Sequence, residues 1–195
     1  MIETALNSIT GHVLIRDYRT KDVIVDKMNS INYENFSIAL AQGVSYRSEG
    51  YINEMVFGNG AAVVSGVGTV TYLPPNVVGT DAQLYNQTYN KVVNDNNSLN
   101  TDTSKNFIRT IHTPGTLYTD VQITCVLDLG EPSGQMAFDT ATDLTTPYVF
   151  NELGLKTRKS VANTGLLISH VVFNPIQKSL NREIEVVYTI RIQTA

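Results

Sequence analysis

Three histidines and a single cysteine are the side chains in this sequence best suited to metal binding or nucleophilic catalysis. His12, His112 and His170 stand far apart, and none has a second His, Cys or acidic residue at the spacing of zinc ligands. Cys125 could pair with a distant histidine as nucleophile and base. It alternates with apolar residues in a strand pattern, which favours a small buried hydrophobe. We therefore expect no metal, no cofactor and no catalytic residue among these four.

A tract rich in Asn and Asp, Asp95 to Asn100, could suggest calcium, because hard cations bind clustered oxygen atoms. The residues at the positions that bind or shape a calcium loop do not match that motif here. Leu99 takes the fifth position, Asn100 replaces the turn glycine, and Asn106 replaces the bidentate glutamate. The sequence predicts a solvated loop.

Two glycine pairs, at Gly58 to Gly60 and at Gly66 to Gly68, contain the start of a phosphate-binding pattern. Neither continues to a third glycine ahead of a helix, so turn glycines are the better interpretation. The sequence also has no G-x-S-x-G and no H-E-x-x-H motif.

Glu183 and Glu185 project from the same face of a predicted strand and could resemble an acid and base pair. Exposed carboxylates beside Arg182 and Arg191 explain them equally well. We expect that the chain is not an enzyme.

The composition describes a polar but weakly charged surface. Of 195 residues, 16% are charged, against about 25% in an average soluble protein, and the net charge is -4. The one dense basic cluster is Lys156, Arg158 and Lys159. These values favour neither a nucleic-acid footprint nor an anionic membrane surface as partner.

One β-rich domain over residues 1–195 is the expectation from this length. A single cysteine excludes an internal disulfide framework. Met1 to Val13 lacks the features of a signal peptide, and the longest apolar stretches fall far short of the roughly 20 residues that a spanning helix needs. We expect a soluble protein without a signal peptide and with no membrane partner.

Most of the chain alternates apolar and polar residues with a period of two, the pattern of half-buried strands. The clearest cases are Arg182 to Gln193, with Ile190 on its apolar face, and Thr119 to Leu129. Further strands are predicted at 12–16, 21–26, 51–57, 69–73, 84–93, 107–112 and 166–173. The fold class expected is an antiparallel β-sandwich or barrel with long loops.

One short helix is predicted at Tyr33 to Gln42. Asn32 suits its N-cap, Ile31 and Phe36 have the spacing of a hydrophobic staple, and Gly43 could close the helix in a left-handed conformation. A second helical turn is predicted at 147–153, because Pro147 suits the first position of a helix.

Four connections are long or irregular: 58–68, 73–76, 93–105 and 130–147. Long loops in a compact domain are usually functional or disordered, and a third interpretation is that they become ordered only against neighbouring subunits. The polar tract from Val93 to Lys105 offers few apolar groups to offset its ordering entropy. We expect it to be an intersubunit arm that becomes ordered against neighbours.

Seven segments of the sequence, taken together, resemble tailed-bacteriophage virion structural proteins. They are Ile9 to Ile15, Val23 to Asp26, Ile31 to Asn35, Met55 to Gly60, Tyr72 to Asn76, Val172 to Arg182 and Tyr188 to Ile192. The resemblance implies a virion subunit of the neck, collar, tail or capsid, made in the host cytoplasm, which assembles with copies of itself and with other virion proteins. It implies no catalytic residues, and no sequence-specific binding of nucleic acid is expected.

A weakly charged β scaffold with long loops suits a ring or shell, because many identical copies can touch without accumulating repulsion. Two alternatives remain open. One is a capsid decoration protein, and the other is a free-standing β-sandwich that binds a ligand such as carbohydrate. The sequence has no Trp for stacking on sugar rings, but it has 10 Tyr.

Overall fold

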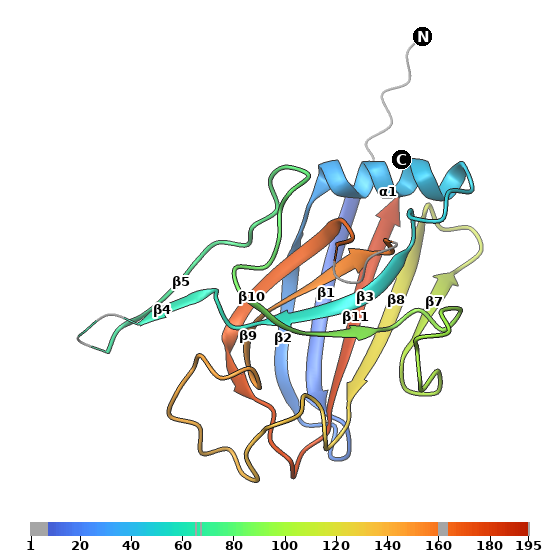
Figure 1. Ribbon diagram of the computed structural model, residues 1–195. Coiled ribbons are helices and arrows are strands. Elements are labelled where there is room, and N and C mark those ends of the chain that lie inside the picture. Colours follow the sequence, from blue (N-terminus) through green and yellow to red (C-terminus); the bar gives the residue numbers. More distant parts are fainter. Residues whose placement is uncertain (1–7, 65, 67, 160–163, 195) are drawn as a thin grey trace.

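The computed structural model describes residues 8–64, 66, 68–159 and 164–194, which form antiparallel strands and one helix (Figure 1). In chain order the elements are β1 (Ser8–Asp17), β2 (Val23–Ile31), α1 (Tyr33–Val44), β3 (Ile52–Gly58), β4 (Ala62–Val64), β5 (Val70–Tyr72), β6 (Gln87–Val92), β7 (Phe107–His112), β8 (Tyr118–Leu127), β9 (Val149–Thr157), β10 (Leu167–Gln177) and β11 (Ile184–Gln193). The prediction of a mainly β chain with one short helix is confirmed.

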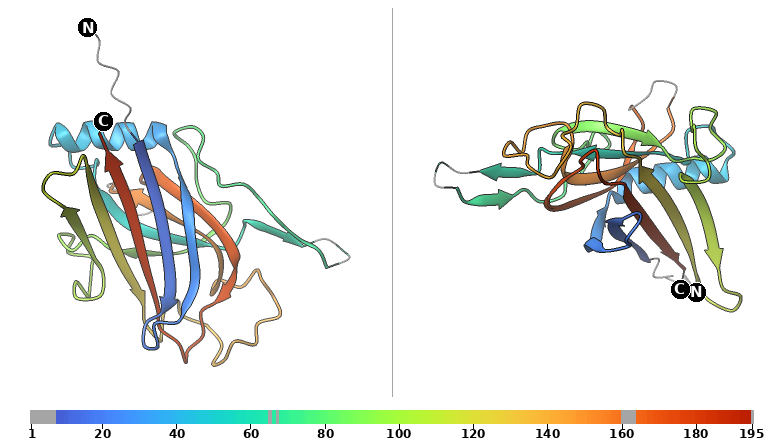
Figure 2. Two further views of the ribbon diagram at one scale, coloured as in Figure 1. Left: turned by 180° about the vertical axis from the view of Figure 1, so that it is seen from behind. Right: turned by 90° about the horizontal axis from the view of Figure 1, so that it is seen from below.

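Nine of the strands form one curled antiparallel sheet in the order β6-β3-β9-β10-β2-β1-β11-β8-β7, and β4 pairs with β5 in a separate hairpin. The large sheet has two halves, and in the described chain these are joined by the pairs Ile31–Ser169 and Ser30–His170. Seen from below, the halves lie one over the other as two layers (Figure 2). The architecture is therefore sandwich-like, with one corner where β2 meets β10.

The register places the apolar residues of β1, β11 and β8 on the inner face. Val13 lies opposite Tyr188, and Tyr188 lies opposite Ile123; all three are fully buried. The Tyr188 hydroxyl donates to Ser169 Oγ at 2.7 Å and accepts from Asn29 Nδ2, so it joins the two halves through the core. The apolar face predicted for the C-terminal strand, including Ile190, is confirmed.

Helix α1 lies across one end of the sheet (Figure 1). Its N-cap is Asn32, as predicted, and Asn32 Oδ1 accepts from the backbone N–H of Asn35 at 3.1 Å. The prediction for Gly43 is wrong, because this glycine lies inside the helix. The chain turns at Tyr46, which has a left-handed φ of 57°.

The helical turn predicted at 147–153 is also wrong, because β9 begins at Val149. Every residue of β9 is buried. A strand covered on both faces loses the alternation that identifies strands in a sequence.

The polar tract from Val93 to Lys105 finds partners within its own subunit. Asn97 Nδ2 donates to Asn53 Oδ1 at 2.6 Å, and Asn94 Nδ2 donates to the carbonyl of Ile52 at 2.9 Å. The structure thus gives this tract contacts within its own chain, and its role as an intersubunit arm stays a prediction. No helix in the described ranges has the length and apolar character needed to cross a membrane.

Candidate functional site

The hairpin formed by β4 and β5 projects away from the sandwich and is the most extended described feature of the molecule (Figure 2). We call residues 62–72 the arm. Val63, Val70 and Tyr72 are exposed to 53%, 39% and 40%. The sequence from Met55 to Thr80 contains no charged residue. The arm therefore offers solvent an apolar, uncharged surface.

An isolated two-stranded hairpin is at best marginally stable in water. This arm is held at both roots by buried polar residues of β9 and β10. Glu152, on β9, is fully buried. Its Oε1 accepts from the N–H groups of Gly60 at 2.9 Å and Asn86 at 2.8 Å, and its Oε2 accepts from the N–H of Tyr85 at 2.9 Å.

His170, on β10, completes the anchor from the neighbouring strand. The backbone N–H of Asn76 donates to His170 Nδ1 at 2.8 Å, so Nδ1 is an acceptor and the proton sits on Nε2. Nε2 lies 3.1 Å from Glu152 Oε2 and donates to it. The histidine is thus neutral and the glutamate ionised. Gly60 precedes β4 and Asn76 follows β5, so the pair holds both ends of the arm.

The balance of burial and hydrogen bonding sets the charge of Glu152. Burial raises the pKa of this carboxyl group. The hydrogen bonds from His170 and from the N–H groups of Asn86, Tyr85 and Gly60 outweigh burial and hold the pKa below its ordinary value. The anchor is therefore a fully paired carboxylate, and its role is structural.

A second pair of contacts fixes the first root. Asn151, next to Glu152, accepts from the N–H of Ala61 at 3.0 Å and donates to the carbonyl of Asn59 at 2.9 Å. Gly60 is needed here because a Cβ would lie 2.6 Å from the backbone nitrogen of Asn86. The glycines at 58–60 therefore serve close backbone approach, in agreement with their assignment as structural glycines.

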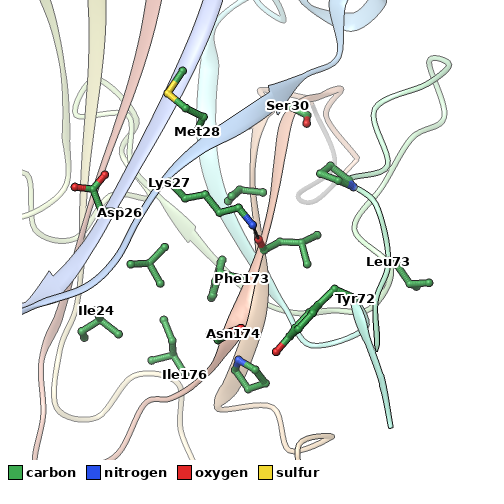
Figure 3. Close-up of a pocket in the computed structure, with 15 residues that line it drawn as sticks. Ile24, Asp26, Lys27, Met28, Ser30, Tyr72, Leu73, Phe173, Asn174 and Ile176 are labelled. Carbon is green, nitrogen blue, oxygen red and sulfur yellow. Dashed lines mark hydrogen bonds between the residues drawn. The ribbon is translucent and has the colours of Figure 1, made fainter. Parts of the chain in front are cut away.

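A groove of about 580 Å³ lies beside the second root, where β2 and β10 separate (Figure 3). Its walls come from β2, from β10 and from the segment that leaves β5. They are mostly apolar and include Ile24, Val25, Tyr72, Val171, Phe173 and Ile176. Lys27 crosses the groove, and its Nζ donates to the carbonyl of Val172 at 2.8 Å.

The two strand glutamates flagged by the sequence lie in a cluster of ion pairs on the outer face of the sheet. Glu185 binds Arg16 and Lys21, and Glu183 binds Arg19. Both glutamate side chains are only 10% exposed. The description of them as exposed carboxylates is wrong.

Their predicted arginine neighbours also have other partners. Arg182 pairs with Asp139, and Arg191 pairs with Asp120 at 2.8 Å. Because Glu183 and Glu185 are each neutralised by cations from the β1–β2 turn region, they brace this end of the sandwich.

The other residues singled out by the sequence are dispersed. His12 pairs with Asp26, while His112 contacts the carbonyl of Tyr118 on the far edge of the sheet. Cys125 is completely buried, as predicted, and burial raises the pKa of its thiol to about 12. Among the described contacts, none joins His12, His112 or Cys125 to the Glu152–His170 pair.

Only part of the basic cluster of the sequence lies at the surface, because Arg158 and Lys159 are exposed but Lys156 is not. Lys156 is buried and donates to Gln87 Oε1 at 2.8 Å, and Arg158 donates to the Tyr51 hydroxyl. In the described residues, no group of three or more His, Cys, Asp or Glu side chains is arranged to hold a metal ion.

Sequence reasoning missed Glu152 as an anchor and Lys178 as a buried amine. Lys178 Nζ donates to the carbonyls of Ser179 at 3.1 Å and Leu129 at 3.4 Å. Burial lowers the pKa of this lysine to about 8. For Glu152 the available signal was an ionisable residue inside a largely apolar run, Val149 to Leu155.

No family model matches the chain, and neither the curated proteins nor the solved structures give a match. The fold and the site on their own define a β-sandwich that carries an anchored, uncharged external arm beside an apolar groove.

Proposed function

We propose that this chain is a structural subunit of a tailed-phage virion that assembles with copies of itself into a symmetric ring or shell at the neck, collar or tail. The observation that carries the assembly part is the arm: an exposed, uncharged hairpin whose two roots are held by a buried Glu–His pair. The virion part comes from the resemblance of the sequence segments described above.

The physical argument for assembly is that the apolar side chains of the arm, Val63, Val70 and Tyr72, are exposed to solvent in the described chain. Exposed strand edges pair readily with other chains, and proteins usually protect them with charge, proline or a covering segment. Here the arm and its flanks lack charge altogether. A neighbouring subunit that packs on the arm would cover its exposed apolar side chains, Val63, Val70 and Tyr72.

The proposal includes no catalytic step. The ionised group most deeply buried in the site, Glu152, uses both oxygens to hold backbone N–H groups and His170. A carboxylate engaged in this way is a poor general base.

The test is the mass of the purified protein before and after removal of the arm. Ala62 lies opposite Tyr72 in the hairpin, and Leu73 N–H donates to the carbonyl of Ala61 at 2.9 Å, so the two ends of the arm are adjacent. A short Asn-Gly turn can therefore replace residues 63–71 and leave Tyr72 in place. We expect a multimer for the unaltered chain by light scattering and a folded monomer for the shortened chain. Electron microscopy of the multimer should show a closed ring or shell.

The control is Val78→Ser, because Val78 is more exposed than Val63 and Val70 and lies outside the arm. It should leave the mass unchanged, whereas Val63→Ser with Val70→Ser should lower it. A chain that stays monomeric at its highest soluble concentration, or a multimer that survives removal of the arm, would refute the proposal.

A further inference from the structure

We infer that the groove between β2 and β10 receives the arm of a second copy of this chain. The inference rests on the proposed function, which says that the arm mediates assembly, and it names the surface on the neighbour where the arm binds.

The groove presents open strand edges. β2 and β10 share the pairs Ile31–Ser169 and Ser30–His170, and beyond these the two strands diverge. Among the described residues, β2 from Val23 to Asn29 pairs with β1 alone, and β10 from Val171 onward pairs with β9 alone. Each strand therefore turns an edge without a strand partner toward the groove. Edges of this kind bind an added strand through main-chain hydrogen bonds.

The groove suits an uncharged strand such as the arm. Two ionic side chains, Asp26 and Lys27, stand among the groove residues. Asp26 Oδ1 already contacts His12 Nε2 at 2.6 Å, and Lys27 Nζ already donates to the carbonyl of Val172. A strand that pairs with β10 takes the carbonyl of Val172 from Lys27, whose exposed ammonium group returns to water, while the contact of Asp26 with His12 is kept. A charged strand would in addition be desolvated against the apolar walls.

A second copy is the occupant, because the subunit's own arm cannot turn back into the groove. Tyr72 and Leu73, at the start of its second root, already form one wall of the groove, and the arm points away from it (Figures 2 and 3). The arm and the groove that binds it are thus two different surfaces of the same chain. Such a contact is heterologous, and repetition of it closes a ring or continues as a filament.

The proposed arm–groove contact also adjoins the arm of the subunit that supplies the groove. An arm seated in the groove touches the root of the host subunit's arm at Tyr72, Leu73 and Pro75. Each subunit therefore gives one arm and accepts one, and the arms and grooves form a belt.

The first experiment places a charge on the wall of the groove. Met28, on the β2 side, is 59% exposed, so Met28→Glu should fold. Asn174→Asp, on the exposed β10 side, is the second variant. We expect each to weaken self-association at least about tenfold in sedimentation equilibrium, because a carboxylate is desolvated when the arm binds. Leu99→Glu, at an exposed apolar residue away from both surfaces, is the matched control and should have no effect.

The second experiment mixes two defective chains. The arm-shortened chain keeps its groove, and the Met28→Glu chain keeps its arm. Alone, each should be monomeric. Together they should form a 1:1 dimer and nothing larger, because one intact arm and one intact groove remain in the mixture.

The outcomes separate the two proposals. If shortening the arm abolishes assembly while both groove variants assemble normally, the arm binds elsewhere and the inference about the groove fails alone. If shortening the arm changes nothing, the proposed function itself fails. A mixture that stays monomeric although each chain is folded by circular dichroism also overturns the groove as acceptor.

Discussion

Replacing the buried anchor with its neutral isostere, Glu152→Gln, tests how the arm is held. The carboxylate accepts four hydrogen bonds, two at each oxygen. Glutamine keeps one oxygen but places an NH₂ group at the other position. If the oxygen stays with Gly60 and Asn86, the NH₂ group faces the N–H of Tyr85 and the Nε2–H of His170.

Histidine cannot relieve this conflict by moving its proton. A shift of the proton to Nδ1 would place it against the N–H of Asn76, which now donates to Nδ1. Two charge-assisted bonds are therefore lost, each worth about 1.5–3 kcal/mol, and the variant should lose about 3–6 kcal/mol. A typical domain has about 5–15 kcal/mol in total, so the loss is large but compatible with folding.

The effect should depend on pH, because the pKa of Glu152 is lower in the folded chain than its ordinary value of about 4.3. A group with a depressed folded pKa contributes its full stability above the unfolded pKa. That contribution is lost as the pH falls through the folded value. The gap in the free energy of unfolding between wild type and Glu152→Gln should therefore be at its full size near neutral pH and should narrow as the pH falls below about 4.3.

Urea unfolding followed by circular dichroism measures the gap at each pH. Amide hydrogen exchange at Gly60, Tyr85 and Asn86 should accelerate in the variant, since these N–H groups lose their acceptor. Glu34→Gln, in the exposed first turn of α1, is the control and should change stability by no more than about 0.5 kcal/mol. A gap below about 1 kcal/mol at neutral pH, or one that is constant with pH, would contradict the role assigned to Glu152.

Two further variants test the core and the buried amine. Ile190→Asp should abolish soluble folded protein, because an unpaired buried carboxylate costs several kcal/mol, on the order of the whole stability, while Thr189→Asp on the opposite face should be tolerated; equal yields would contradict the assigned faces. Burial lowers the pKa of Lys178 to about 8, so the unfolded chain binds this proton more tightly and stability should rise as the pH increases from 8 toward about 10. Lys178→Met should lack that rise in urea titrations, and an unchanged pH slope would show that the amine is not the cause.

Local patterns in the sequence were enough to predict most of the elements. The alternating residues of β8 and β11 identify both strands and their buried face, because a strand half covered by core repeats with a period of two. Asn32 marks the start of α1 because its side chain can satisfy a free N–H there. Cys125 was predictable as a buried hydrophobe from the same alternation.

Other features depend on contacts between distant parts of the chain. β9 gave no strand signal because neighbours cover both of its faces. Glu183 and Glu185 looked exposed because the cations that pair with them come from the other end of the chain.

The arm belongs to this second group. The absence of charge in the arm can be read from the sequence. Whether the segment packs on the sandwich or projects from it depends on which residues hold its two ends. Glu152 and His170 become neighbours because β9 pairs with β10, and that pairing aims one carboxylate at backbone N–H groups as far away in sequence as Gly60. Side-chain chemistry is written in the sequence, but the partners of a buried charge exist only once the sheet has formed.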